Sequence, residues 1–125
     1  MKKLLFIAIF SIGLFSMGQA QILDYYIYNS SITDTWNYGM VDAGPTPAIY
    51  ELNIAPNDLR TGTISNFAFQ LEWKAEDSNN CGIYQNVPGP TGVIIAPTSC
   101  FGTNVTYQVG VIIPFVHYYL KLELS

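Results

Sequence analysis

One histidine, His117, is the only imidazole in this chain of 125 residues, so any Ser-His-Asp or Cys-His catalytic arrangement would have to use it. His117 shares odd parity with Tyr119 and Lys121, opposite a set of apolar even-numbered positions, which predicts that it points outward from a strand. No serine lies in a Gly-x-Ser-x-Gly turn, so this nucleophile motif is missing, which further weakens a hydrolase. These residues predict a protein that is not an enzyme.

Carboxylate pairs are the remaining route to catalysis, since glycoside hydrolysis needs two of them across a cleft. Nine acidic residues provide pairs by chance, and their spacing distinguishes none of those pairs. Three glutamates fall on the expected outward sides of strands and three aspartates fall in expected turns, namely Glu51, Glu72 and Glu123, and Asp34, Asp42 and Asp58. A carboxylate-dependent hydrolase therefore stays open as an alternative without assigned residues.

Oxygen ligands concentrate in one stretch, from Glu76 to Asn80, directly before Cys81. Ca²⁺ takes about six to eight such ligands, so Glu76, Asp77 and Asn79 form a weak candidate site for this ion. The stretch lacks the spacing of the D-x-[DN]-x-[DN]-G loop, and its composition is also that of a solvated turn. One histidine and two cysteines are too few for a transition-metal site, so no other cofactor is predicted.

Tyrosine is the most informative residue type, because it combines an apolar ring with a polar tip suited to interfaces. Nine of the 15 aromatic residues in positions 21–125 are tyrosines, and they occupy both faces of the expected first and last strands. The sequence predicts a contact surface for a glycan or a protein partner, built from Tyr26, Tyr28 and Tyr119 together with Trp36 from a neighbouring turn. The alternative is that most of these rings fill the core.

Cys81 and Cys100 are the only cysteines, and neither has the cationic or histidine neighbours that lower the pKa of a thiol. A structural disulfide between them is predicted, closing a loop of about 20 residues and stabilising the fold by roughly 3 kcal/mol. The enclosed Pro88-Gly89-Pro90 would make this loop a rigid recognition segment. A secreted inhibitor or toxin-like protein is therefore a further alternative.

The first 20 residues have the order of a secretory signal peptide, with two lysines, an apolar run from Leu4 to Phe15, and then Gly18-Gln19-Ala20. About 12–14 apolar residues fall short of the roughly 20 that span a bilayer, so cleavage is predicted and no transmembrane anchor remains. Residues 21–125 then form a single domain that is secreted, periplasmic or held at the cell surface. Three cations against nine acids leave a net charge of −6, which argues against nucleic acid as a partner.

β-Branched and aromatic residues dominate positions 21–125, and turn-forming residues recur every eight to twelve positions, which predicts an all-β fold. We expect a small antiparallel β-sandwich of about seven to eight strands. The expected strands are 22–28, 35–41, 48–54, 61–73, 82–86, 92–96, 103–113 and 115–124. The clearest alternation of apolar and polar residues runs from Asn66 to Lys74.

The apolar positions change from odd to even numbers near Pro114, between the runs 105–113 and 116–124. Proline cannot donate to a ladder, and a one-residue parity change is what a bulge or a change of sheet produces. A long final segment bent at Pro114 is therefore predicted. A tight hairpin is disfavoured there, because Ile113-Pro114-Phe115 lacks the Gly or Asn of two-residue turns.

Together these features predict a small exported, non-catalytic protein that works by binding or by surface assembly, with an unknown ligand. A secreted carbohydrate-binding module is the nearest alternative. Only 11% of the residues are charged, and charge is a usual defence of exposed strand edges. Self-association through edge strands is therefore also open.

Overall fold

The computed structural model describes residues 21–44, 47–65, 71–87, 94–95 and 103–125, and the predicted signal peptide lies outside these ranges. The described residues form strands and no helix, in agreement with the all-β prediction. In chain order the strands are β1 (Ile22–Asn29), β2 (Trp36–Asp42), β3 (Ile49–Ile54), β4 (Leu59–Ser65), β5 (Leu71–Glu76), β6 (Gly82–Val87), β7 (Ile94–Ile95), β8 (Val105–Ile113) and β9 (His117–Leu124).

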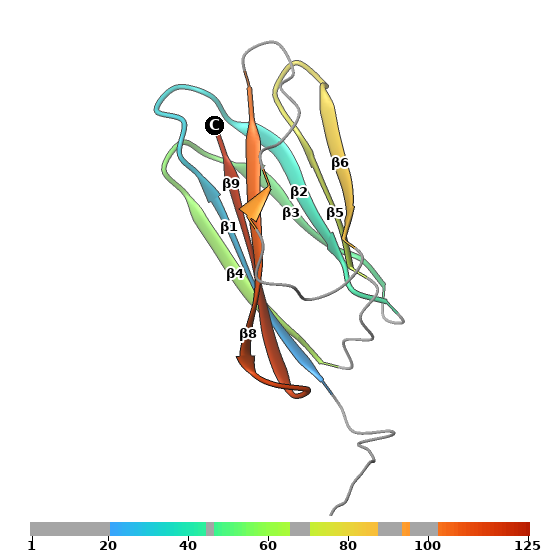
Figure 1. Ribbon diagram of the computed structural model, residues 1–125. Helices are drawn as coiled ribbons and strands as arrows, with labels where there is room; N and C mark the ends of the chain where they lie inside the picture. The colour runs from blue at the N-terminus through green and yellow to red at the C-terminus, as the bar shows by residue number, and fades with distance from the viewer. Residues whose placement is uncertain (1–20, 45–46, 66–70, 88–93, 96–102) are drawn as a thin grey trace, which may run out of the picture.

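The strands build two sheets that face each other as a β-sandwich (Figure 1). One sheet has the order β4-β1-β9-β8-β7 and the other the order β3-β2-β5-β6. The described part of the chain contains no helix long and apolar enough to cross a membrane. The sandwich is not wholly antiparallel as predicted, because β1 and β9 run parallel. A parallel pair needs a long connection, and here almost the whole domain lies between the two strands. The pairing therefore cannot be predicted from a local sequence pattern.

The core lies between the sheets and is filled from every long strand. Its largest fully buried side chains include both tryptophans, Trp36 and Trp73. Strict alternation supplies most of it: β1 and β9 bury every second residue, and Leu71, Trp73 and Ala75 are buried along β5. The alternation read from the sequence is therefore confirmed for the part of 66–74 that the structure describes.

The predicted strand 61–73 is corrected to two strands. β4 ends at Ser65 in the five-stranded sheet, and β5 begins at Leu71 in the four-stranded sheet. The chain therefore changes sheet within a segment whose β-branched and aromatic content looks continuous. Residues 66–70 lie outside the described ranges.

The predicted bend at Pro114 is wrong, because β8 and β9 are antiparallel neighbours joined by a hairpin turn. Phe115 adopts the left-handed conformation (φ 65°) that Gly or Asn usually supplies in turns. The turn closes through the Val116 N–H, which donates to the Ile113 carbonyl at 3.0 Å. A register shift between Val111 and Ile113 adds a bulge. The three-residue turn and this bulge together account for the parity change that the sequence shows.

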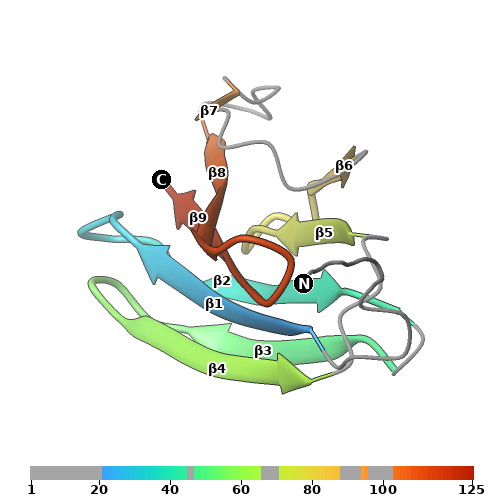
Figure 2. The same ribbon diagram turned by 60° about the horizontal axis from the view of Figure 1, so that its bottom comes forward.

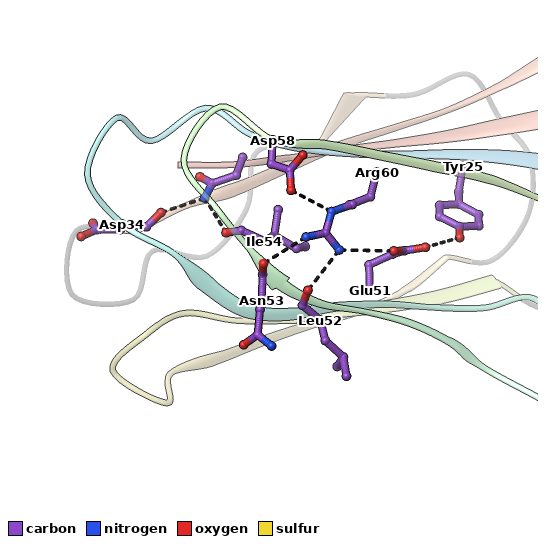
Figure 3. A network of polar contacts seen from close by, with 9 residues as sticks. Tyr25, Asp34, Glu51, Leu52, Asn53, Ile54, Asp58 and Arg60 are labelled. Atoms are coloured by element: carbon purple, nitrogen blue, oxygen red, sulfur yellow. Dashed lines mark hydrogen bonds and ion pairs between the residues drawn. The ribbon is translucent and has the colours of Figure 1, made fainter.

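A polar network closes the side of the sandwich where β3 and β4 run side by side (Figure 2). We call Tyr25, Glu51, Asp58 and Arg60 the seam network (Figure 3). The Arg60 guanidinium donates to Asp58 Oδ2 at 2.8 Å and lies 3.5 Å from Glu51 Oε1. It also donates to the backbone carbonyls of Leu52 and Asn53, each at 3.0 Å. Arg60 thereby links an edge strand of one sheet to an edge strand of the other.

Tyr25 completes the seam network from β1, where its hydroxyl donates to Glu51 Oε2 at 2.5 Å. Burial, reinforced by this carboxylate, raises the pKa of Tyr25 to about 12. Glu51 is half-buried and bonded, so its predicted outward position is wrong. Its neighbours Tyr50 and Leu52 are exposed, because Glu51 takes the opposite parity and turns toward Tyr25.

Candidate functional site

The outer face of the five-stranded sheet carries three rows of side chains that run across β1, β9 and β8. The middle row aligns Tyr26, Lys121 and Gln108, because Lys121 pairs with both of the others in register. The row on one side aligns Asp24, Tyr119 and Gly110, and the row on the other side aligns Tyr28, Glu123 and Thr106. Side chains one row apart lie within reach of one another, so the three strands present one continuous surface.

Tyr119 lies flat across the surface because its partner in the row is a glycine. A Cβ added at Gly110 would lie only 2.2 Å from Tyr119 Cζ, so a larger residue there would displace the ring. Gln108 Nε2 donates to the Tyr119 hydroxyl at 2.8 Å and fixes the outer end of the ring. The glycine and the amide together hold this ring in one orientation.

Lys121 sits between two aromatic rings. Its Nζ lies 5.2 Å from the centroid of the Tyr119 ring and 5.9 Å from that of Tyr26, both within the range of cation–π contacts. Among the described residues no carboxylate lies within ion-pair distance of this ammonium group. Lys121 therefore keeps hydrogen-bond donors available to a bound molecule.

A groove of about 710 Å³ is hollowed into this face. Its size falls in the range of about 300–1,000 Å³ that is typical of small-molecule sites. Nine residues line it, and we call this site the outer groove: Tyr26, Tyr28, Leu59, Thr106, Tyr107, Gln108, Lys121, Leu122 and Glu123. A second, smaller hollow of about 210 Å³ adjoins Tyr26 over β1 and β4.

Of the four residues predicted to form a contact surface, three share one face of the sheet and one does not. Tyr26, Tyr28 and Tyr119 lie on one face as predicted. Trp36 does not join them, because it is fully buried. It is the first residue of β2 rather than part of a turn, and it pairs with the equally buried Ile54 in the core of the other sheet.

Several groove residues were missed by reasoning from the sequence. Lys121 and Glu123 were placed outward by parity, and both are exposed, but nothing marked them as site residues. Thr106 and Gln108 show the same outward parity along β8. Their meeting with Tyr26 and Tyr28 depends on the parallel pairing of β1 with β9, which joins residues about 95 positions apart.

His117 lies on the outward face of β9, as predicted, and is half-exposed. Its Nε2 lies 2.8 Å from Asp24 Oδ2, and the other oxygen of Asp24 accepts from Thr63 Oγ1 at 2.8 Å. This pair lies on the sheet face beside the smaller hollow, which Asp24 lines. The carboxylates of Glu51 and Asp58 belong to the seam network, where both contact Arg60. A hydrolytic carboxylate pair would have to come from other residues.

The weak Ca²⁺ candidate has its central carboxylate engaged by protein donors. Asp77 is buried, its Oδ1 accepts from the backbone N–H groups of Asn79 and Cys81, and its Oδ2 accepts from Thr103 Oγ1 at 2.9 Å. Glu76 accepts from the Asn37 amide at 3.1 Å. Asn80 takes the left-handed conformation, as asparagine often does in turns. The stretch thus forms the β5–β6 turn, and Asp77 bonds this turn to Thr103, just before β8.

The predicted disulfide falls only partly within the described residues. Cys81 is half-buried at the start of β6, and Cys100 lies outside the described ranges. The bridge therefore stays a prediction. Most of the loop that the disulfide would close, including Pro88-Gly89-Pro90, also lies outside those ranges. The inhibitor alternative therefore stays a prediction from the sequence.

Comparison with known proteins gave no match to this chain, whether with family models, with curated proteins or with solved structures.

Proposed function

We propose that this protein is an exported, non-catalytic binding protein that takes a carbohydrate into the outer groove. The observation that carries the proposal is the arrangement around Lys121. A cationic donor with no carboxylate partner among the described residues stands between the rings of Tyr26 and Tyr119, with Glu123 two residues along the same strand face. Sugars need this combination, because their apolar C–H faces pack on aromatic rings while their hydroxyls require both donors and acceptors.

The polar groups of the outer groove fit a neutral polyhydroxylated ligand. Lys121 supplies donors, Glu123 supplies acceptors, and Thr106 and Gln108 supply both. A ligand carrying several anionic groups would meet Glu123 beside the only cation of the groove, in a domain of net charge −6. Peptide recognition along a sheet edge would use free backbone groups, whereas this groove lies on a sheet face whose backbone is already paired.

The test is a glycan array probed with the wild type, with Tyr26→Ala/Tyr28→Ala and with Lys121→Ala. Tyr84→Ala is the matched control, because Tyr84 is 53% exposed on β6 of the other sheet. Loss of a stacking ring costs about 1.5 kcal/mol, which corresponds to roughly a tenfold fall in affinity per ring. The groove variants should lose the array signal and the control should keep it. A wild type that binds no glycan, or an equal loss in the control, would contradict the proposal.

Surface assembly is the second candidate function, and the edge strand β6 favours it. This strand ends the four-stranded sheet and carries the exposed Tyr84 among uncharged residues. On the other edge of that sheet, Arg60 occupies the Leu52 and Asn53 carbonyls, which blocks addition of a strand there. Light scattering across concentration tests this candidate, since a protein that remains monomeric throughout would argue against assembly.

A further inference from the structure

An exposed apolar tip ends the β8–β9 hairpin. We define the apolar tip as four residues whose exposed fractions are 45, 48, 50 and 69%, namely Val111, Ile112, Ile113 and Phe115. Buried residues recur along β8 as far as Gly110, and every residue after it is exposed. The hairpin therefore extends past the opposing sheet. Figure 1 shows its turn at one end of the molecule, opposite the β1–β2 connection.

Several backbone groups of this turn are already paired, which lowers the cost of entering an apolar phase. The Val116 N–H donates to the Ile113 carbonyl, and the Ile22 N–H donates to the Val116 carbonyl at 2.8 Å. The Phe115 carbonyl accepts from Gln21 Nε2 at 3.1 Å. Unpaired backbone groups are costly in hydrocarbon, and these bonds remove much of that cost.

The apolar tip carries no charge and no polar side chain. The whole stretch from Val109 to Val116 is uncharged, and the first ionisable side chains behind it, Asp24 and His117, bond each other. A specific protein interface carries roughly one hydrogen bond per 100–200 Å², and these side chains offer none. Insertion into hydrocarbon requires no hydrogen bond from these side chains. The lack of basic residues further points to neutral lipid headgroups, because attraction to anionic lipids needs Lys or Arg clusters.

The β1–β2 and β3–β4 turns, at the end opposite the apolar tip, carry the carboxylates of Asp34 and Asp58. Acidic groups are best left in water, so a molecule that docks through the apolar tip keeps these two carboxylates away from the lipid.

The predicted leader lies close in the sequence to a residue that contacts the apolar tip. Gln21, which bonds Phe115, is six residues beyond Phe15, the end of the apolar run in the predicted leader. Six extended residues reach at most about 20 Å. A leader held in the membrane during export would therefore place the apolar tip within that distance of the bilayer.

From these observations we propose that the apolar tip is a membrane-docking element that inserts into the interfacial region of a bilayer of neutral lipids. Insertion at this shallow depth is favoured by apolar side chains and by paired backbone groups, and the hairpin end has four such side chains and several such groups. The inference concerns a different surface from the outer groove and does not depend on glycan binding. Docking through the apolar tip leaves the outer groove, on the sheet face, open to solvent.

The test uses the exported protein, with its amino terminus established by mass spectrometry, and phosphatidylcholine vesicles. Phe115→Trp should shift its emission to the blue when vesicles are added, and lipids with brominated chains should quench it. Ile113→Ser/Phe115→Ser should lower vesicle partitioning more than tenfold in co-sedimentation. Ile32→Ser is the matched control, because Ile32 is 81% exposed at the opposite end of the molecule, and it should partition like the wild type.

Three results would overturn the proposal. The first is an unchanged Phe115→Trp emission with vesicles, which does not depend on how the serine variant folds. The second is partitioning that requires phosphatidylglycerol, since this would mean attraction by charge. The third is an oligomer in the absence of lipid that Ile113→Ser/Phe115→Ser dissociates, because a second copy of the chain would then cover the apolar tip.

Discussion

The seam network and the outer groove are built from the same kinds of side chain. Only in the seam network is the cation bound by carboxylates of the protein. In the seam network the cation, Arg60, contacts two carboxylates and two backbone carbonyls. In the outer groove the cation, Lys121, lies over two rings and has no carboxylate partner among the described residues. A cation whose donors are all used holds a fold together, whereas one with free donors is available to a ligand.

At the seam network, and again beside the outer groove, a tyrosine lies opposite a glycine on the adjacent strand. Tyr25 lies opposite Gly62 and Tyr119 lies opposite Gly110, and in each pair a Cβ on the glycine would overlap the ring. The Tyr25 ring is buried and its hydroxyl is bound by Glu51, while the Tyr119 ring is half-exposed. The same tyrosine–glycine pairing therefore packs a ring into the core in one case and orients a ring on the surface in the other.

Alanine at the two glycines should separate these roles most strongly. Gly62→Ala would place a Cβ 2.5 Å from the Tyr25 ring, which cannot move without breaking its bond to Glu51, so we expect a loss of about 3–4 kcal/mol of unfolding free energy. Gly110→Ala displaces a ring that can swing into solvent and should cost about 1 kcal/mol or less. Urea unfolding measures both. Equal losses of unfolding free energy in the two variants would mean that both tyrosine rings are held equally firmly, which would contradict the comparison.

Removing the two cations gives the next largest difference. Arg60→Ala leaves two carboxylates and two carbonyls without their partner and should cost about 2–3 kcal/mol, while Lys121→Ala loses only exposed cation–π contacts and should cost less than about 0.5 kcal/mol. Urea unfolding midpoints at one pH give the comparison. A strongly destabilised Lys121→Ala would show that the outer groove is part of what holds the fold.

The sequence identified the faces of the strands better than it identified their neighbours. Alternation is local, so the outward positions of Tyr26, Tyr28 and Tyr119 could be predicted. Placing Lys121 between Tyr26 and Tyr119 needs the register of β1 against β9, which no local pattern encodes. The outer groove was therefore predictable in its rings and unpredictable in its polar groups.

Errors arose where local geometry departs from regular strand. Asn53 and Phe115 both take left-handed backbone conformations, at φ 54° and 65°. Near Asn53 the alternation of β3 breaks, so that Leu52 is exposed while Ile54 is buried although they share parity. At Phe115 a residue other than Gly or Asn makes the hairpin turn that the sequence disfavours. Local propensity cannot predict such positions, because tertiary contacts offset the conformational cost of the left-handed backbone.

The smallest expected effect is the response of the seam network to alkaline pH. Tyr25 ionises near pH 10 when unfolded, and its folded pKa is raised to about 12, chiefly by burial and then by Glu51. The neutral hydroxyl is thus favoured in the folded state. Its contribution is fully present below pH 10 and is lost as the pH rises to about 12, and a rise of this size corresponds to a contribution on the order of 2 kcal/mol.

Tyr25→Phe isolates this contribution, because it keeps the ring over Gly62 and removes the ionising group. Burial also raises the pKa of Tyr107, and desolvation and Glu72 raise that of Tyr84, so the variant retains these other sources of alkaline destabilisation. We expect the variant to be less stable at pH 8 and the two stabilities to converge toward pH 12, as measured by urea unfolding across this range. Parallel curves would mean that Tyr25 ionises as freely as an exposed tyrosine, and that the seam network is as open as the outer groove.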